Sequence, residues 1–132
     1  MTRVLALDYG AARCGTAVSD PTGSVVTPLE VIERPESPAG MEALVALVRR
    51  TGAEVVVVGL PLTLRGHAGA QAAAAGSFAG RLRRAAGVPV ELHDERLTTR
   101  QAAASPGRSG EDSRAAAHLL EDWLRATTEA RA

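Results

Sequence analysis

The sequence predicts an α/β domain with a mixed five-stranded sheet and helices on both of its faces. Two apolar segments, 4–8 and 14–19, are separated by a short glycine-containing turn, which favours an antiparallel hairpin. The unbroken valines at 55–58 are typical of a strand buried on both faces, as in a parallel sheet covered by helices. Segments with helical spacing of apolar residues precede and follow this strand, as expected for parallel strands joined by crossovers.

The first three strands are expected to form an antiparallel meander. The first ends in the carboxylate Asp8, and Tyr-Gly follows at once, where the chain must turn. A turn that begins at Asp20 leads into a third strand at 24–32, in which Pro28 favours an edge position. We interpret Asp20 as a turn residue and Cys14 as a small buried strand residue.

Helix start and stop signals delimit the rest of the chain. Ser37 followed by Pro38 is typical of an N-cap and first helical residue, and Gly52 and Gly87 are plausible C-caps. Thr98, with Gln101 three residues later, matches a capping box. The elements expected after the meander are a helix at 37–52, a strand at 54–60 beside the first strand, an alanine-rich helix at 66–86, a strand at 88–93, a short helix after Thr98 and a last helix at 111–126.

Length and composition indicate one globular domain at 1–126, with 127–132 as a flexible C-terminal tail. Only 2% of the 132 residues are aromatic, which disfavours base stacking as the main mode of nucleic-acid binding. The formal net charge is zero and every basic residue is arginine. This composition disfavours a large non-specific nucleic-acid surface but leaves room for a local arginine patch.

Cysteine usage and hydropathy favour a cytoplasmic protein without a membrane partner. The single cysteine cannot form an internal disulfide. Neither a signal peptide nor an apolar run of membrane-spanning length is present in the sequence.

Three carboxylates are expected to meet at one edge of the sheet. Asp8 ends the first strand, Glu95 follows the fifth, and Asp112 shares the inward face of the last helix with Ala116 and Trp123. Clustered carboxylates raise one another's pKa unless a cation neutralises them, and oxygen ligands suit Mg²⁺ or Mn²⁺. Two structural alternatives stay open, because Asp8 also suits a turn and Asp112 also favours the helix dipole.

Five short segments carry a specific combination of motifs. They are Leu7-Asp8-Tyr9-Gly10 with Arg13 and Gly15, Val18-Ser19-Asp20-Pro21, Val58-Gly59-Leu60-Pro61-Leu62 with Gly66, Asp94-Glu95-Arg96-Leu97-Thr98-Thr99, and Asp112 before Ala115-Ala116. In this order and at these separations they resemble the YqgF/RuvX family across essentially the whole chain. That family has a ribonuclease H-like fold, and its members are named both as Holliday junction resolvases and for maturation of the small-subunit ribosomal RNA precursor.

The resemblance implies a metal-dependent nuclease in which Asp8, Glu95 and Asp112 are the catalytic residues and metal ligands, holding two Mg²⁺ or Mn²⁺ ions. The first expected substrate is the 5′ end of pre-16S ribosomal RNA, and branched DNA, cut by Holliday junction resolution, is the second. Ribosomal particles are a further expected partner. A monomer and a homodimer are both compatible with the sequence, although symmetric junction cleavage calls for a dimer.

Five residues are candidates for substrate binding: Arg13, Arg96, Gly10, Gly59 and Gly66. Arginine suits bidentate phosphate contacts, although a surface charge or a salt bridge explains each arginine almost as well. The glycines are better explained by close backbone approach than by phosphate contact. The chain departs from the family pattern where Ala12 replaces a basic residue, and in a short segment before the last helix whose one basic residue is Arg108. These departures bear on substrate affinity more than on the acids.

Two other function classes remain open from the sequence. An actin-like ATPase or sugar kinase also places Asp and glycine after a strand, but it needs two lobes, and 132 residues supply one. A catalytically silent nucleic-acid or ribosome-binding module fits the low charge, although the presence of all three acids counts against it.

Overall fold

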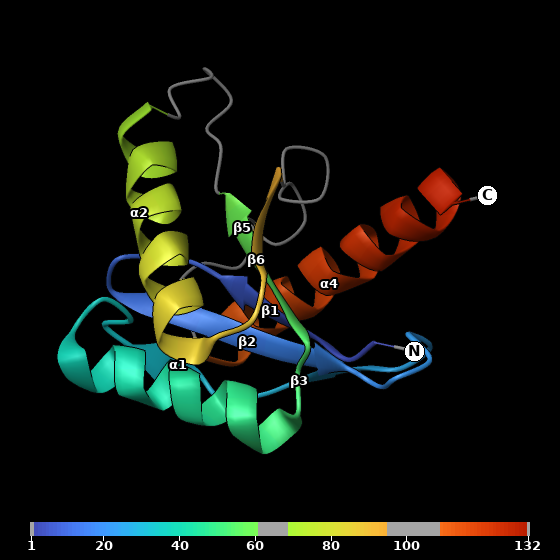
Figure 1. Ribbon diagram of the computed structural model, residues 1–132, viewed down its shortest axis with the longest axis horizontal. Helices are drawn as coiled ribbons and strands as arrows, with labels where there is room; N and C mark the ends of the chain where they lie inside the picture. Colours follow the sequence, from blue (N-terminus) through green and yellow to red (C-terminus); the bar gives the residue numbers. More distant parts are fainter. Residues whose placement is uncertain (1, 61–68, 95–108, 132) are drawn as a thin grey trace.

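The computed structural model describes residues 2–60, 69–94 and 109–131 (Figure 1). Its elements are β1 (Val4–Asp8), β2 (Arg13–Ser19), β3 (Val26–Pro28), β4 (Ile32–Glu33), α1 (Pro38–Thr51), β5 (Val55–Leu60), α2 (Gly69–Ala86), β6 (Val90–Asp94) and α4 (Ser109–Arg131). The short helix predicted after Thr98 lies outside the described residues.

The sheet has the mixed topology predicted from the sequence. Its strand order is β3-β2-β1-β5-β6. β1 pairs antiparallel with β2 and parallel with β5, and β6 pairs parallel with β5. β1 and β5 are therefore central, and the carboxyl ends of β1, β5 and β6 lie at the same edge of the sheet.

The prediction of one continuous third strand was wrong, because a bulge divides this segment into β3 and β4, both paired with β2. Pro28 pairs with Ala17 and Ile32 pairs with Cys14, so the three residues 29–31 face only residues 15 and 16. One extra residue in a strand disrupts the ladder locally and bends it. The hydroxyl of Thr16 satisfies the Glu30 carbonyl inside the bulge, at 2.5 Å.

The helix ends follow the predicted caps in α1 and α2. Ser37 Oγ accepts a hydrogen bond from the Gly40 amide at 3.0 Å, Pro38 is the first residue of α1, and Gly52 ends the helix with a φ of 70°. Gly87 ends α2 in the same left-handed conformation, with a φ of 75°. The last helix is longer than predicted, since α4 continues past Ala126 to Arg131.

Helices cover both faces of the sheet (Figure 1). α1 and α2 pack on one face, where Leu44, Leu47, Phe78 and Leu82 are fully buried. α4 packs on the other face through three buried side chains, those of Ala116, Leu119 and Leu120. Alternate β1 residues enter the two cores, so Leu5 and Leu7 face α1 and α2, whereas Val4 and Ala6 face α4. No helix in the described part of the chain is both long enough and apolar enough to cross a bilayer.

Candidate active site

Asp8 lies at the carboxyl end of central strand β1, half-buried, as the sequence predicts for the tip of this strand. It continues the alternation of Val4 and Ala6, so its side chain is on the α4 face. Its partners in the two neighbouring strands are Gly15 and Gly59. Neither neighbour therefore places a side chain beside this carboxylate on the α4 face of the sheet.

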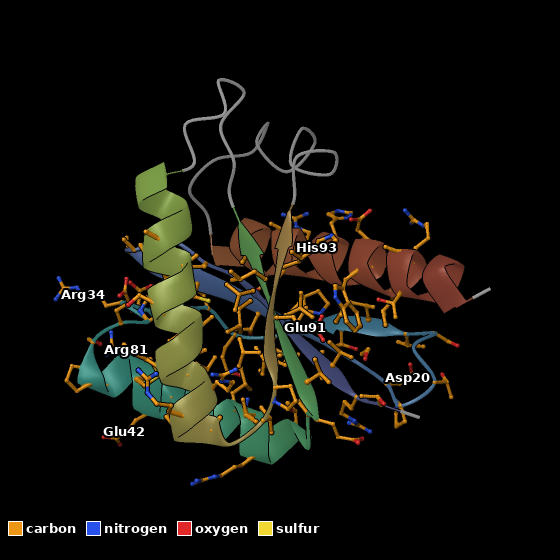
Figure 2. All side chains as sticks on the ribbon, turned by 45° about the horizontal axis from the view of Figure 1, so that its top comes forward. Asp20, Arg34, Glu42, Arg81, Glu91 and His93 are labelled. Atoms are coloured by element: carbon orange, nitrogen blue, oxygen red, sulfur yellow. The ribbon has the colours of Figure 1, made fainter. Side chains whose placement is uncertain are left out.

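β6 brings His93 to the same level of the sheet as Asp8, since His93 pairs with Gly59. His93 is on the α4 face, where its Nε2 lies 2.8 Å from Oδ2 of Asp122 (Figure 2). This contact joins the carboxyl end of β6 to α4. The described part of β6 ends at Asp94, one residue before Glu95, so Glu95 itself lies outside the described residues.

The Asp122 side chain is only 26% exposed, although helical spacing puts it on the same side of α4 as His118. His118 is 56% exposed, and its Nδ1 lies 3.5 Å from Oε1 of Glu121. Helical spacing alone assigns Asp122 to the outer face, and no sequence signal reveals that β6 reaches it.

α4 begins at the same end of the sheet as Asp8. The hydroxyl of Ser113, which is buried, donates to the Leu29 carbonyl at 2.5 Å. The Leu29 amide in turn donates to the Thr16 carbonyl at 2.8 Å. Thr16 is adjacent to Gly15, the partner of Asp8, so this chain of hydrogen bonds fixes the first turns of α4 close to the Asp8 edge. Asp112 belongs to the first turn of α4, and its side chain lies outside the described residues.

Two of the five predicted substrate-binding residues, Arg96 and Gly66, lie outside the described residues. The other three, Arg13, Gly10 and Gly59, lie near Asp8. Arg13 opens β2, and strand alternation puts it on the same face as Gly15 and Asp8. A Cβ at Gly10 would lie 2.8 Å from the Arg13 carbonyl oxygen, so close backbone approach accounts for this glycine. Gly59 is the partner of Asp8 in β5 and places no side chain beside it.

Tyr9 supports the β1 end from the opposite face. The residue is 7% exposed, and the centroid of its ring lies 4.8 Å from that of the Phe78 ring. Its hydroxyl donates a hydrogen bond to Oε2 of Glu36. The pKa of Tyr9 is raised from 10.0 to about 12. Burial is the main cause, and the hydrogen bond to Glu36 is the next.

We expect the native protein to show tyrosinate absorbance only near pH 12, and Tyr9 is the sole tyrosine, so the signal is unambiguous. The fold favours the neutral phenol. The contribution of the Tyr9 phenol to the stability of the fold is therefore complete below pH 10 and is lost as the pH rises through about 12. The chain unfolded in guanidinium should titrate near pH 10, and Glu36→Gln should titrate at lower pH than the native protein. A native midpoint near 10 would contradict the buried environment.

The contact between His93 and Asp122 should stabilise the fold measurably. Asp122→Asn replaces a charge-assisted hydrogen bond by a neutral one at a site where the side chains are 19% and 26% exposed. We expect a loss of about 1 kcal/mol in the free energy of unfolding, measured with urea. Glu121→Gln is the matched control on the same helix, since its pair with His118 is 56% and 53% exposed and should be worth almost nothing. Equal losses in the two variants would show that the half-buried contact has no special weight.

The fold is similar to that of a solved structure. The structure described as "T. thermophilus RuvC in complex with Holliday junction substrate" matches with a TM-score of 0.62, at 19% identity, over 97% of this chain and 96% of that chain. The mixed sheet, with α1 and α2 on one face and α4 on the other, is thus the ribonuclease H-like fold of the RuvC type, as predicted.

The chain belongs to the RuvX family, described as "RuvX: Holliday junction resolvase", which it matches over residues 2–126. A relative from Rhodococcus erythropolis is 42% identical, with 92% of this chain and 77% of the relative covered. One from Anaeromyxobacter sp. is 40% identical, with 92% and 96% covered. Both relatives carry the name "Putative pre-16S rRNA nuclease". The family resemblance seen in the sequence motifs is therefore confirmed.

Proposed function

We propose that this protein is a metal-dependent nuclease that hydrolyses phosphodiester bonds at the carboxyl edge of β1, β5 and β6. The observation that carries the proposal is the position of Asp8, a half-buried carboxylate at the end of the central strand with glycine on both sides. Family membership and the RuvC-type fold support it.

We assign the other two acidic positions, Glu95 and Asp112, from the elements that carry them. β6 runs parallel to β1 through β5 and ends one residue before Glu95. Glu95 has the same alternation as Glu91 and His93, so a strand continued by one residue would direct it to the α4 face that Asp8 occupies. Asp112 precedes Ser113, whose hydrogen bond fixes the first turns of α4 near this edge.

The donor chemistry of the proposed site fits Mg²⁺ or Mn²⁺. Three carboxylates supply only oxygen atoms, and neither Gly15 nor Gly59 places a side chain beside Asp8. Among the side chains that the structure describes, no three His, Cys, Asp or Glu residues form a metal-binding group, and Asp8 is the one member of the proposed set so described. When bound, divalent ions supply an activated water and neutralise the charge that develops on the phosphate oxygens.

The residues of the chain have distinct proposed roles. Asp8, Glu95 and Asp112 would bind the divalent cations at the carboxyl edge of the sheet. Arg13, on the face of Asp8, binds and orients a phosphate of the substrate, as its bidentate guanidinium allows. Arg96 has the same proposed role by its position beside Glu95. His93 and Asp122 position the end of β6 relative to α4.

Pre-16S ribosomal RNA is the first proposed substrate, because both relatives above carry that substrate in their names. Holliday junction DNA is the second, because the matching family is described as a resolvase and the fold is that of RuvC. Ribosomal particles, where the precursor is processed, follow from the first proposal as partners.

The decisive experiment compares three substrates under one condition. The protein is incubated with Mg²⁺ or Mn²⁺ and end-labelled single-stranded RNA, a fragment spanning the 16S precursor 5′ end, or a four-way DNA junction. Cleavage of the precursor fragment that stops when EDTA is added supports the first proposal. Symmetric nicking of the junction would replace it by the second. Binding without cleavage of any substrate would leave a silent nucleic-acid-binding module and overturn the nuclease assignment.

A further inference from the structure

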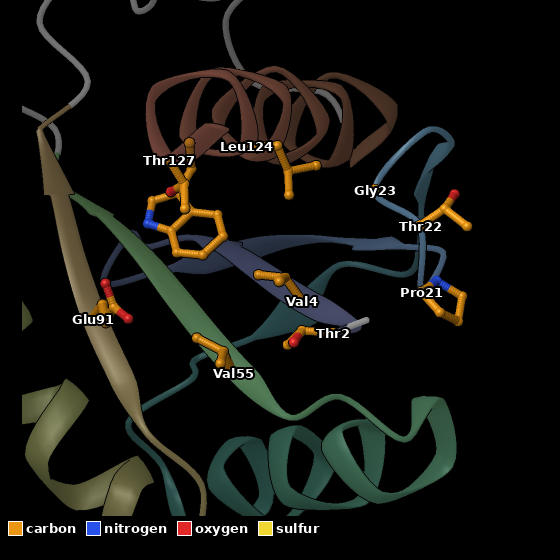
Figure 3. Close-up of a pocket in the computed structure, with 10 residues that line it drawn as sticks. Thr2, Val4, Pro21, Thr22, Gly23, Val55, Glu91, Leu124 and Thr127 are labelled. Carbon is orange, nitrogen blue, oxygen red and sulfur yellow. The ribbon is translucent and has the colours of Figure 1, made fainter. Parts of the chain in front are cut away.

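A cavity of about 450 Å³ lies between the second half of α4 and the sheet, away from the Asp8 edge (Figure 3). Val55 and Leu124 contribute apolar surface to it, Thr2, Thr22 and Thr127 contribute hydroxyl groups, and the lining also includes Val4, which is only 1% exposed. Val4 precedes Asp8 by four residues on β1, which corresponds to about 13 Å along a strand. The volume is in the range of small-molecule sites, and the cavity is distinct from the proposed nuclease site.

Glu91 gives this cavity its charge. It lies on β6 and pairs with Val57, so it faces α4 as His93 does, two residues further along (Figure 2). Within residues 2–60, 69–94 and 109–131 its carboxylate makes no ion pair and no side-chain hydrogen bond. The described lining residues include no basic side chain. The described lining of the cavity therefore has a net negative charge, which favours a cation and disfavours a phosphate.

Trp123 gives the cavity an aromatic surface. It lines the cavity from α4 and is half-buried, in contrast to the fully buried Leu119 and Leu120 on the preceding turn. A carboxylate together with an indole is the combination that recognises a planar cation, since the guanidinium group pairs with carboxylates through two hydrogen bonds and stacks on aromatic faces.

The wall opposite Glu91 is preorganised. Asp20 Oδ1 accepts hydrogen bonds from the amides of Ser24 and Val25, at 2.8 and 3.0 Å, which hold the turn at 20–23 in one conformation. Gly23 takes a φ of 76° in this turn and faces α4, where an added Cβ would make an ordinary van der Waals contact of 3.6 Å with Leu124 Cδ2. A preformed wall lowers the ordering cost that a small ligand must overcome on binding.

We propose that this cavity binds a guanidinium group carried on an aliphatic stem, with Glu91 pairing the cation, Trp123 packing against it and the stem lying along Val55 and Leu124. Such a group belongs either to a free guanidino compound or to an arginine of a partner polypeptide. The site is independent of the proposed nuclease activity, since its residues do not include the acids of that site.

Intrinsic fluorescence tests the proposal directly, because Trp123 is the only tryptophan of the chain. The protein is titrated with agmatine and, separately, with the peptide acetyl-Gly-Arg-Gly-amide. We expect a saturable change of emission that weakens with added salt and that needs about tenfold more ligand in Glu91→Gln. Glu42→Gln is the matched control, because it removes the same charge from the exposed surface of α1 on the opposite side of the sheet (Figure 2).

The two probes identify the source of the cation. Tighter binding of the peptide supports the proposal with a partner polypeptide as the source, and tighter binding of agmatine supports it with a free compound. The peptide with citrulline in place of arginine, which keeps the shape but has no charge, should not bind. The proposal is overturned if neither probe gives a saturable change, if Glu91→Gln binds as well as the native chain, if the citrulline peptide binds equally, or if guanosine binds more tightly than both probes.

Discussion

Asp8→Asn is expected to reduce phosphodiester cleavage by about 1,000-fold or more while the protein keeps its fold. The amide has nearly the same size and shape as the carboxylate, so the half-buried position between Gly15 and Gly59 accommodates it. It lacks the negative charge that a divalent cation requires at the centre of the proposed site. The measurement is the single-turnover rate on the 16S precursor fragment, or on the junction if that is the cleaved substrate.

A matched carboxylate controls for charge in this experiment. Glu54 is exposed and immediately precedes β5, at the opposite edge of the sheet from Asp8. Glu54→Gln changes the net charge by the same amount and should retain the native rate. Urea unfolding of both variants shows whether either has lost stability. Cleavage by a folded Asp8→Asn protein at more than a tenth of the native rate would remove Asp8 from the mechanism.

The strands and caps could be predicted because their signals are local. Four consecutive valines identify β5 as a buried central strand, whichever strands it pairs with. Ser37 and Pro38 specify the start of α1, because the Ser37 side chain accepts a hydrogen bond from an amide in the first turn of the same helix. The bulge that separates β3 from β4 could not be predicted in this way. It arises only from the pairing with β2, because the register in which Pro28 pairs with Ala17 is shifted by one residue from the register in which Ile32 pairs with Cys14.

The environment of Asp8 also depends on pairing between distant segments. The sequence indicates that a carboxylate ends β1, but Gly15 and Gly59 become its neighbours only through the antiparallel and parallel registers of the sheet. The contact between His93 and Asp122 has the same origin. It joins edge strand β6 to a residue that helical spacing alone assigns to the outer face of α4. Glu95 and Asp112 stay predictions. Glu95 and the side chain of Asp112 lie outside the described residues.

Phe78→Ala should cause the largest loss of stability, about 3 to 5 kcal/mol in the free energy of unfolding. Phe78 is among the largest fully buried side chains of the described core, and its ring packs against Tyr9, the residue after Asp8. Removing it leaves a cavity between α2 and the end of β1, so the same variant should also lower the pKa of Tyr9 toward 10 by admitting water.

Trp123 provides the unfolding signal for this measurement, because it is packed against the opposite face of the sheet and is not itself altered by the substitution. Phe78→Leu keeps most of the apolar volume and should lose much less stability than Phe78→Ala. Val25→Ala removes apolar atoms from a side chain that is 58% exposed and should change the free energy of unfolding by less than about 0.5 kcal/mol. If Phe78→Ala proved no less stable than Val25→Ala, the packing of α2 on the Asp8 end of β1 could not be what stabilises this half of the core. The rigid placement of Asp8 would then have to come from α4 alone.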